Sequence, residues 1–432
     1  MLFNLPGLTE HRFSVTAFPI LKLLAAVFGL TQVFFLIDSN FSHPKEFQQS
    51  DYVMTFYVAG HLSATGRESE LYPTSGATSF AGASFDKAAH DLLPDLPKNT
   101  TAIYMYSPLL ALFFAPLSFL SPTWSVLLWQ ALSLVALFFS CKILARSMEI
   151  DFPESFLMCA LFGPVFIMLW SGQLGLVLGV FPLCLGYFFL LRNRALLAGL
   201  IWSVLFLKPQ YLPSAVFVGL VFALNRKFRL FLGLVLGVLI VATMNLLLFS
   251  PELIARWLTS HELSDTLFTD VRYGIPAHLV TSIPADILLL LRSDTRLVWK
   301  WPIYFGALSL WFIGLCYCWK ICRAELAWRT QVSLILAVSC VLSSLALPHL
   351  LYYDLCILIP GGFLFATTNK LVHFKTITTP ARLGWFSITL YLVIFVLFKA
   401  NAVFSLILEL ILLALFLFLI VRIDRALAPQ TP

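Results

Sequence analysis

Long apolar segments, separated by short polar turns, run through almost the whole chain. A helix needs about 17–25 mostly apolar residues to cross the hydrocarbon of a bilayer. Segments of that length lie at about 15–37, 123–145, 154–170, 174–191, 230–249, 301–319, 330–347, 350–368, 383–398 and 402–421. The pattern therefore predicts an all-α fold, a polytopic integral membrane helical bundle.

Two shorter apolar pieces, 195–207 and 211–224, flank the turn Lys208-Pro209-Gln210. Both are too short to cross, so a hairpin made from them would place its tip below the bilayer surface. Non-helical backbone at that depth is tolerated only against protein or a wet cavity, and paired short segments point to a binding site. We therefore expect Lys208 to line a pocket.

The distribution of charge decides how to count two further pieces, 105–120 and 284–291. If neither crosses, the basic turns share one side, while the loop 38–104 on the other side carries four basic and eight acidic residues. Lysine and arginine mark cytoplasmic loops. This arrangement predicts about twelve spans, both termini in the cytoplasm, a first outer loop at 38–122 with juxtamembrane helices, and a second at 250–300. Residues 1–432 show no linker or repeat and are predicted to form one domain.

Composition supports the membrane assignment. The chain is 60% hydrophobic and 12% charged, with a mean hydropathy of +0.90, whereas soluble domains carry about 25% charge. The net charge of +6 is spread over turns and is not a nucleic-acid signal. All eight cysteines lie within apolar segments, which leaves none for a disulfide in an outer loop. We expect no metal site among them.

Asp51 follows the first apolar segment and opens a polar, aromatic stretch that reads as a helix to about Ser63. One interpretation is that Asp51 caps this helix. The other is that it is a general base, placed where an acceptor hydroxyl can arrive. The other loop carboxylates look like a solvated surface; these are Glu68, Glu70, Asp86, Asp91 and Asp95.

Lys208 is the leading candidate for binding a phosphate, because a charge within the membrane is functional by default and a compact ammonium suits that group. Arg272 and His349 are weaker phosphate candidates. Gln173 and Gln210 are either plain turn residues or donors to sugar hydroxyls. Tyr352 and Asp354 cluster with His349 in one turn, where a satisfied interfacial histidine is the alternative. Glu409, in the last span, is expected to face the bundle interior.

Four segments resemble, in order, those of glycosyltransferase family 87, also called polyprenol-phosphate-mannose-dependent mannosyltransferases. They are Asp51-Tyr52-x3-Phe56-Tyr57-x-Ala59-Gly60-x5-Gly66-x4-Leu71-Tyr72-Pro73, the run from Tyr106-Ser107-Pro108 to Pro116-Leu117, Ser171-Gly172-Gln173, and Lys208-Pro209-Gln210. The resemblance covers about residues 50–230, with a weaker match at Pro348 to Pro360. Ser107 stands where the family usually has a second proline, and we expect it to loosen that turn.

The resemblance implies a GT-C architecture and an inverting glycosyltransferase with Asp51 as catalytic base. The donor would be a polyprenyl-phosphate sugar, with mannose as one candidate sugar, and the acceptor a glycolipid or envelope glycan. The resemblance implies that the phosphate of the donor binds to Lys208, Arg272 and His349. The sugar or the acceptor would contact Tyr57, Gln173, Gln210, Tyr352 and Asp354. No cofactor, metal or nucleic acid is implied.

The implied location is a bacterial cytoplasmic (inner) membrane, with the active site on the periplasmic or outer face. Two other functions stay open at this point: a lipid or glycolipid transporter (a flippase), and a non-catalytic subunit of an envelope-glycan assembly. A transporter would carry charges through its spans and an inverted repeat; here the polar residues gather on one face.

Overall fold

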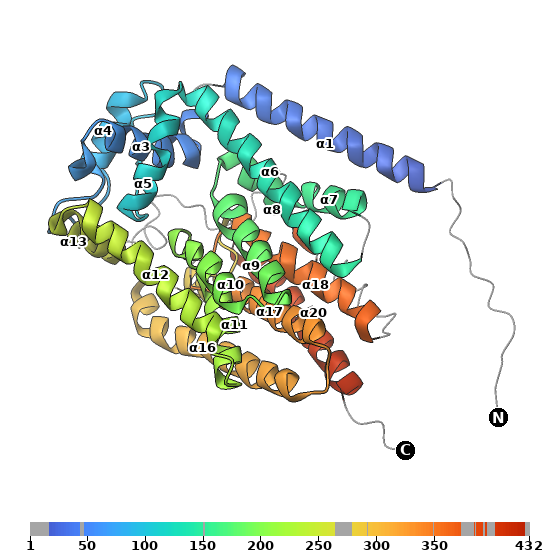
Figure 1. Cartoon of the computed structure of the whole chain (residues 1–432). Coiled ribbons are helices and arrows are strands. Elements are labelled where there is room, and N and C mark those ends of the chain that lie inside the picture. Colours follow the sequence, from blue (N-terminus) through green and yellow to red (C-terminus); the bar gives the residue numbers. More distant parts are fainter. Residues whose placement is uncertain are drawn as a thin grey trace, which may run out of the picture.

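The computed structural model describes residues 17–43, 47–149, 152–263, 279–291, 293–348, 350–372, 384, 386–391, 394 and 402–427. Within these ranges every regular element is a helix, and the only strand-like pairing is an isolated antiparallel bridge between Val280 and Leu351. The predicted all-α fold is confirmed (Figure 1).

The elements of the first part of the chain are α1 (Ala17–Ser42), η1 (Tyr52–Tyr57), α3 (Val58–Ala64), η2 (Glu68–Glu70), α4 (Ser84–Leu92), α5 (Pro108–Phe114), η3 (Ala115–Phe119), α6 (Pro122–Met148), α7 (Phe152–Ala160), α8 (Gly163–Ser171), η4 (Leu176–Val180) and α9 (Phe181–Leu191). The second part contains α10 (Ala195–Trp202), η5 (Ser203–Leu207), α11 (Leu212–Leu224), α12 (Arg229–Leu248), α13 (Pro251–Ser260), η6 (His261–Leu263), α15 (Ile283–Leu290), α16 (Ser293–Arg323), α17 (Trp328–Ala346), η9 (Tyr352–Ile357), α18 (Leu358–Val372) and α20 (Ala402–Leu427).

Fewer helices could span a membrane than the twelve that the sequence suggests. In the described part of the chain five are long and apolar enough, within α6, α12, α16, α17 and α20. A sixth would be the pair α8 and η4–α9, which bends by 115° at a short break. One predicted span, 154–170, is divided into α7 and α8. The count of twelve is not confirmed.

The short apolar pieces have the form that the sequence predicts. Ala195–Leu207 and Leu212–Leu224 are separate short helices on either side of Lys208. Pro108–Phe119 is also short, and α15 has eight residues. These helices fall below the length that a crossing requires. The short helices on either side of Lys208 are therefore confirmed, while the prediction that 105–120 and 284–291 do not cross stays a prediction.

Residues 47–119, which we call the loop module, pack into an aromatic core of their own. Tyr52, Phe56 and Phe114 are fully buried; the Phe114 ring stacks on that of Phe56 and meets that of Tyr52 edge-on. Trp129 of α6 closes this core from the side of the long helices, with its ring 4.9 Å from that of Phe114. Figure 1 places α3, α4 and α5 together at one end of the molecule, beside α13.

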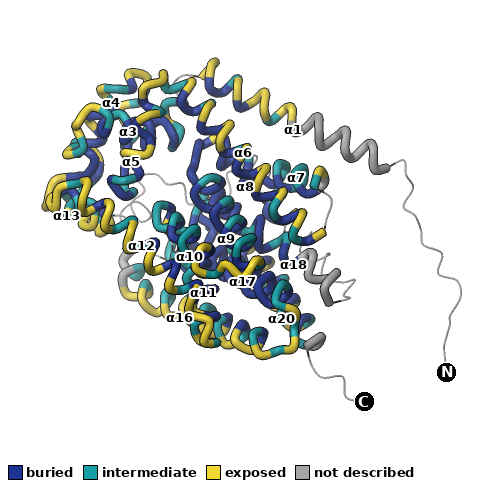
Figure 2. The backbone as a smooth tube through the Cα atoms, viewed as in Figure 1, coloured by how far each residue is buried: buried dark blue, intermediate teal, exposed yellow. Residues whose placement is uncertain are grey.

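The long helices form a second core, which we call the membrane body. Its centre is α17, in which 89% of an 18-residue apolar stretch is buried. The helices α11, α16 and α18 pack around it. The outer faces of α12, α16 and α20 remain exposed and apolar, as Figure 2 and the exposed leucines show. Such all-round apolarity is expected where lipid is the solvent.

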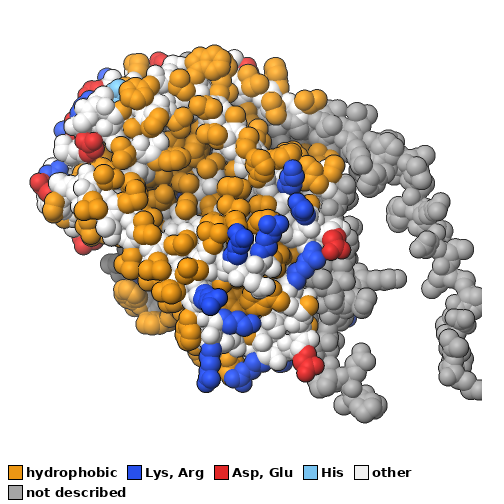
Figure 3. Space-filling model, viewed as in Figure 1, with side chains coloured by type: hydrophobic (Ala, Val, Ile, Leu, Met, Phe, Trp, Pro, Cys, Tyr) orange, Lys and Arg blue, Asp and Glu red, His pale blue; other side chains and the backbone are white. Residues whose placement is uncertain are grey.

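Lysine and arginine side chains gather at the end of the molecule away from the loop module (Figure 3). Several are held there by specific contacts, such as Lys227 over the Trp328 ring at 4.4 Å and Arg329 with Glu149 at 3.1 Å. This separation of charge is what the predicted topology requires. Which end faces the cytoplasm stays a prediction.

Candidate active site

Four of the residues singled out from the sequence meet in one place, although they are up to 303 positions apart (354 − 51). Gln173 Nε2 donates to Asp51 Oδ2 at 2.8 Å, and Lys208 Nζ donates to Gln173 Oε1 at 3.1 Å. Lys208 Nζ also lies 3.2 Å from Asp354 Oδ1. The four side chains form a continuous chain from carboxylate to amide to ammonium to carboxylate.

Asp51 stands immediately before η1 and is partly exposed. Its side chain makes no capping hydrogen bond to that helix; instead Ser50 Oγ accepts from Val53 N, at 3.4 Å. The capping interpretation of Asp51 is therefore wrong. Burial of the carboxyl group raises the pKa of Asp51, while the hydrogen bond from Gln173 and the positive charge of Lys208 oppose that rise.

Gln173 is aimed by the tight end of α8. Gly172 has φ +68°, a left-handed conformation that glycine adopts without strain. The next amide, Gln173 N, donates back to Met168 O at 3.0 Å, as in a helix C-terminal motif. Trp129 Nε1 donates to Gln173 O at 3.4 Å. The backbone of this turn is fixed on both sides.

Lys208 lies in the break between η5 and α11 and is 0% exposed. The rings of Tyr106 and Tyr353 lie 5.8 Å and 5.3 Å from its ammonium, within the range of cation–π attraction. An isolated ammonium would be very costly at this depth, so the Asp354 carboxylate and the Gln173 amide are needed to hold it.

Asp354 belongs to η9 and is 1% exposed. Its backbone oxygen accepts from Tyr211 Oη at 3.3 Å. Tyr106, Tyr211 and Tyr353 were not proposed as site residues from the sequence, although Tyr106 opens one of the segments that carry the resemblance. Aromatic side chains are common in apolar segments, and no local pattern marked these three.

Among the described residues, no hydrogen bond or ion pair joins Tyr57, Tyr352 or Gln210 to this cluster. Tyr57 Oη donates to Leu120 O at 3.1 Å, and Tyr352 Oη donates to Ile388 O at 2.7 Å. Gln210 follows Lys208 by two residues, and its buried Oε1 has no hydrogen-bond partner among the described residues. Arg272 and His349 lie outside the described residues.

Two minor expectations are corrected. Asp86 is not part of a solvated surface: it is 7% exposed and accepts from Gly82 N at 2.8 Å and Ala102 N at 2.7 Å. Ser107 does not leave its turn loose. Its hydroxyl donates to Asn245 Oδ1 of α12 at 2.6 Å and accepts from Leu109 N at 3.3 Å. A serine thus ties the start of α5 to a long helix of the membrane body.

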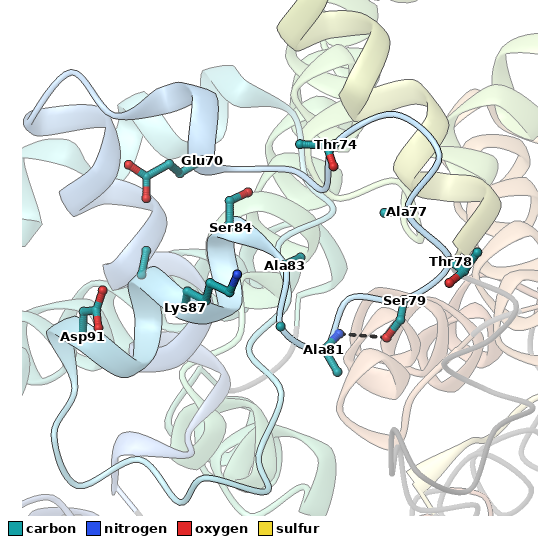
Figure 4. A pocket seen from close by; sticks show the side chains of 12 residues that line it. Glu70, Thr74, Ala77, Thr78, Ser79, Ala81, Ala83, Ser84, Lys87 and Asp91 are labelled. Atoms are coloured by element: carbon teal, nitrogen blue, oxygen red, sulfur yellow. Dashed lines mark hydrogen bonds between the residues drawn. The ribbon is translucent and has the colours of Figure 1, made fainter.

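A groove of about 670 Å³ opens on the loop module, away from Asp51. It lies between the segment 74–84 and α4, and its polar lining includes Glu70, Thr74, Thr78, Lys87 and Asp91 (Figure 4). Glu70 is already paired with Arg67 at 2.7 Å. None of the four clustered side chains lines this groove, so we do not place the chemistry there.

A second pair of acids is buried elsewhere. Asp286 of α15 and Glu409 of α20 are 0% and 1% exposed and lie close enough for each to influence the other's charge, but none of their four carboxyl oxygens has a hydrogen-bond partner among the described residues. Among the described residues no basic side chain pairs with either. Burial raises the pKa of Asp286 to about 7. Glu409 faces the bundle interior, as predicted.

No group of three or more His, Cys, Asp or Glu side chains that could hold a metal ion occurs among the described residues. The eight cysteines are free thiols, five of them fully enclosed in the membrane body. Neither observation adds a site to the cluster around Lys208.

The chain matches the sequence profile of glycosyltransferase family 87 over residues 104–348. Searches of curated proteins and of solved structures gave no significant match. The matched region contains Tyr106, Gln173 and Lys208, whereas Asp51 precedes it and Asp354 follows it. More than half of the chain is covered. With its long apolar helices, this chain thus belongs to glycosyltransferase family 87, a family of membrane glycosyltransferases.

Proposed function

We propose that this protein transfers a sugar from a polyprenyl-phosphate donor to a hydroxyl group of a lipid or glycan acceptor, with inversion and with Asp51 as general base. Mannose is one candidate sugar. The observation that carries the proposal is the convergence of Asp51, Gln173, Lys208 and Asp354 in a family 87 chain. A partly exposed carboxylate beside a buried cation is the arrangement that a base in a half-wet site requires.

In the proposed step the acceptor oxygen attacks the anomeric carbon of the donor. The bond from that carbon to the phosphate oxygen breaks, the acceptor's proton passes to Asp51, and polyprenyl phosphate leaves with the bonding electrons. Such donors carry one phosphate, so the proposal calls for no divalent metal. The proton later returns to water through the exposed side of Asp51.

Asp51 suits the base role better than Asp354. Asp354 is enclosed and paired with Lys208, so protonating it would leave a buried ammonium without its partner. Asp51 is partly exposed, and the hydrogen bond from Gln173 occupies Oδ2 only. No described residue donates to Oδ1, which leaves that oxygen for the incoming proton.

A count of charges supports further phosphate ligands. Asp51, Asp354 and Lys208 carry a net charge of −1, and a sugar phosphodiester adds another −1. The leaving phosphate then gains more negative charge, which a buried site must stabilise. Because Lys208 already balances Asp354, we propose that Arg272 and His349 complete the phosphate site. In this proposal, Lys208 stabilises the leaving phosphate through the electrostatic field of its positive charge.

The remaining features of the proposal follow from the predicted topology. The donor enters sideways from the bilayer, and the site faces the periplasm or exterior of a bacterial inner membrane, with both termini in the cytoplasm. Gln210, whose buried Oε1 lacks a partner, is retained as a sugar contact. Tyr57, Tyr352 and Asp354 would contact the sugar or acceptor only after giving up the bonds they make here.

The test is sugar transfer by the purified protein in nanodiscs, using a panel of polyprenyl-phosphate sugars and an envelope-lipid extract. Wild type should consume one donor and release polyprenyl phosphate. Asp51→Asn should still bind donor but turn over about 100- to 10,000-fold more slowly. Asp91→Asn, an exposed carboxylate of the same module, is the matched control and should leave turnover unchanged.

The other outcomes are equally informative. Equal turnover by wild type and Asp51→Asn would remove Asp51 from the base role while leaving an enzyme. No transfer from any donor, together with movement of lipid between leaflets, would favour the transporter. Neither transfer nor lipid movement would favour a non-catalytic assembly subunit.

A further inference from the structure

We propose that Gln173 is a positioning residue for the catalytic base and not a sugar ligand: its amide orients the Asp51 carboxylate and keeps it ionised. This inference rests on the proposed function, because it assumes that Asp51 takes the proton. It assigns Gln173 a different role from the one that its place in an outer turn suggested.

Both ends of the Gln173 amide are occupied within the protein. Nε2 donates to Asp51 Oδ2 at 2.8 Å, and Oε1 accepts from Lys208 at 3.1 Å. The side chain is 4% exposed. An amide engaged and enclosed in this way has no face for a sugar hydroxyl.

The direction of the amide is dictated by its neighbours. An ammonium can only donate and an ionised carboxylate can only accept. Oε1 must therefore face Lys208, and Nε2 must face Asp51. Of the natural side chains of this length, glutamine alone offers an acceptor at one branch and a donor at the other. The hydrogen bond also holds Oδ2 in place, which leaves Oδ1 as the oxygen to which no described residue donates.

The backbone around Gln173 is built for close approach to residues 51 and 52. A Cβ at Gly172 would lie 2.3 Å from Tyr52 Cβ, a distance that real atoms do not allow. The residue next to Gln173 thus packs directly against the residue next to Asp51. Together with the bonds to Met168 O and from Trp129, this fixes the turn before the side chain makes any contact.

Substitution should therefore change the protonation of Asp51 and not only the fold. Gln173→Glu keeps the shape, but its carboxylate cannot donate and repels Asp51, so the two acids would share a proton. Gln173→Asn is shorter by one methylene and loses contact with Asp51. Both changes remove a charge-assisted hydrogen bond that favours the ionised form.

The primary measurement is the pH dependence of kcat for sugar transfer. Because the ionised base is the active form, raising its pKa moves the acidic limb of the profile to higher pH. We expect a shift of about one to two pH units for Gln173→Glu and a smaller one for Gln173→Asn. The KM for the donor should change little, whereas loss of a sugar ligand would raise KM and leave the limb in place.

A second measurement does not depend on turnover. A hydrophobic carbodiimide reacts with protonated buried carboxyls, and peptide mass spectrometry reports the labelling of Asp51 at each pH. The labelling midpoint should move upward in Gln173→Glu. Gln130→Glu is the matched control, since Gln130 is buried and bonded to Leu169 O without touching Asp51. It should destabilise the fold yet leave the Asp51 midpoint where it is.

The outcomes separate the two proposals. A wild type that transfers no sugar overturns the proposed function, while a shifted labelling midpoint would still show that Gln173 controls Asp51. An unshifted limb and midpoint in Gln173→Glu overturn the positioning role even if transfer is observed. Equal midpoint shifts in Gln173→Glu and Gln130→Glu would also overturn it, because they would reflect general loosening.

Discussion

The described part of this molecule holds two pairs of acids in enclosed surroundings, and they differ in what stands beside them. Asp51 and Asp354 share the ammonium of Lys208, directly or through Gln173. Asp286 and Glu409 have only each other and hydroxyl groups such as that of Ser405. Two adjacent carboxyls without a cation cannot both be ionised, so the second pair retains a proton.

The difference lies in what compensates the negative charge of each pair. An ionised carboxylate needs compensation when water is excluded, and in this chain a lysine in a broken hairpin provides it. The Asp286–Glu409 pair lies where α15 packs on α20, and among the described residues no basic side chain stands beside it. Burial alone therefore does not mark a catalytic carboxyl; the neighbouring cation does.

Among the changes that test this comparison of the two acid pairs, removing the positive charge of Lys208 should have the largest effect. Lys208→Met leaves the carboxylates of Asp51 and Asp354 without a compensating positive charge. This pair would then resemble the pair formed by Asp286 and Glu409. We expect turnover to fall at least about 100-fold and the free energy of unfolding to fall by about 3–5 kcal/mol. Activity assays and thermal unfolding in detergent measure both.

The double variant Lys208→Met/Asp354→Leu is the control for stability. It replaces the ion pair by apolar groups of similar volume, which should restore most of the stability but not the turnover. Recovery of turnover would contradict the role given to Lys208.

A change that moves Gln173 relative to Asp51 should have the next largest effect. Gly172→Ala places a methyl group 2.3 Å from Tyr52 Cβ on a backbone at φ +68°, so the Gln173 turn must move. We expect a stability loss of about 2–4 kcal/mol from overpacking and the left-handed backbone, with a clear drop in turnover. The readouts are the unfolding temperature and kcat.

Gly76→Ala separates the two causes. Gly76 has φ +84°, and nothing lies within 4 Å of an added Cβ, so only the backbone cost of about 1–2 kcal/mol applies. Similar losses in both variants would argue against the close packing of residues 51–52 on 172–173.

The Asp286–Glu409 pair should make the free energy of unfolding depend on pH. The pKa of Asp286 is raised to about 7 in the folded protein, against about 3.9 in an unfolded chain. The folded state thus binds the extra proton, and its advantage is full below about pH 4 and lost as pH rises through 7. We expect the free energy of unfolding to fall by about 2–3 kcal/mol between pH 5 and 8 from this group.

Thermal unfolding of wild type and Asp286→Asn across that range tests the sign. The variant should show a flatter dependence, because it has no proton to lose at this position. A steeper fall in the variant would mean that Asp286 is ionised in the folded state.

The smallest effect is expected for Glu409→Gln. An amide resembles a carboxyl group that keeps its proton, so stability should change by less than about 1 kcal/mol and turnover by less than about twofold. The same change of carboxyl to amide at Asp51 should nearly abolish turnover. A large loss at Glu409 would show that this carboxyl is charged after all, and the contrast would fail.

Much of the fold could be predicted from the sequence because it depends on local pattern. The short helices around Lys208 follow from apolar length. The number of spans is not confirmed, since a stretch such as 154–170, which hydropathy joins, is divided into α7 and α8. Asp86 looked solvent-exposed because nothing local shows that Gly82 and Ala102 will surround it.

The candidate site was partly predictable for the same reason. Asp51, Gln173, Lys208 and Asp354 are polar side chains at the ends of apolar segments, where they stand out. Their pairing could not be predicted, since Lys208 meets Asp354 across 146 positions of sequence (354 − 208). Tyr106 and Tyr353 were missed because their role depends on that pairing.

The aromatic core of the loop module has a consequence for how the protein is made. Although Asp51 is synthesised early, the core beneath it includes Trp129 of α6 and, beyond α8, Leu174 and Leu178. The ribosome must therefore deliver some 130 further residues, roughly, before this part of the module can close, because synthesis runs from the N-terminus. The salt bridge between Lys208 and Asp354 can form only later, after Asp354 has emerged from the ribosome. Nascent chains halted before that point would carry Asp51 without the Lys208–Asp354 ion pair, so the four-residue cluster can be complete only after residue 354 has emerged.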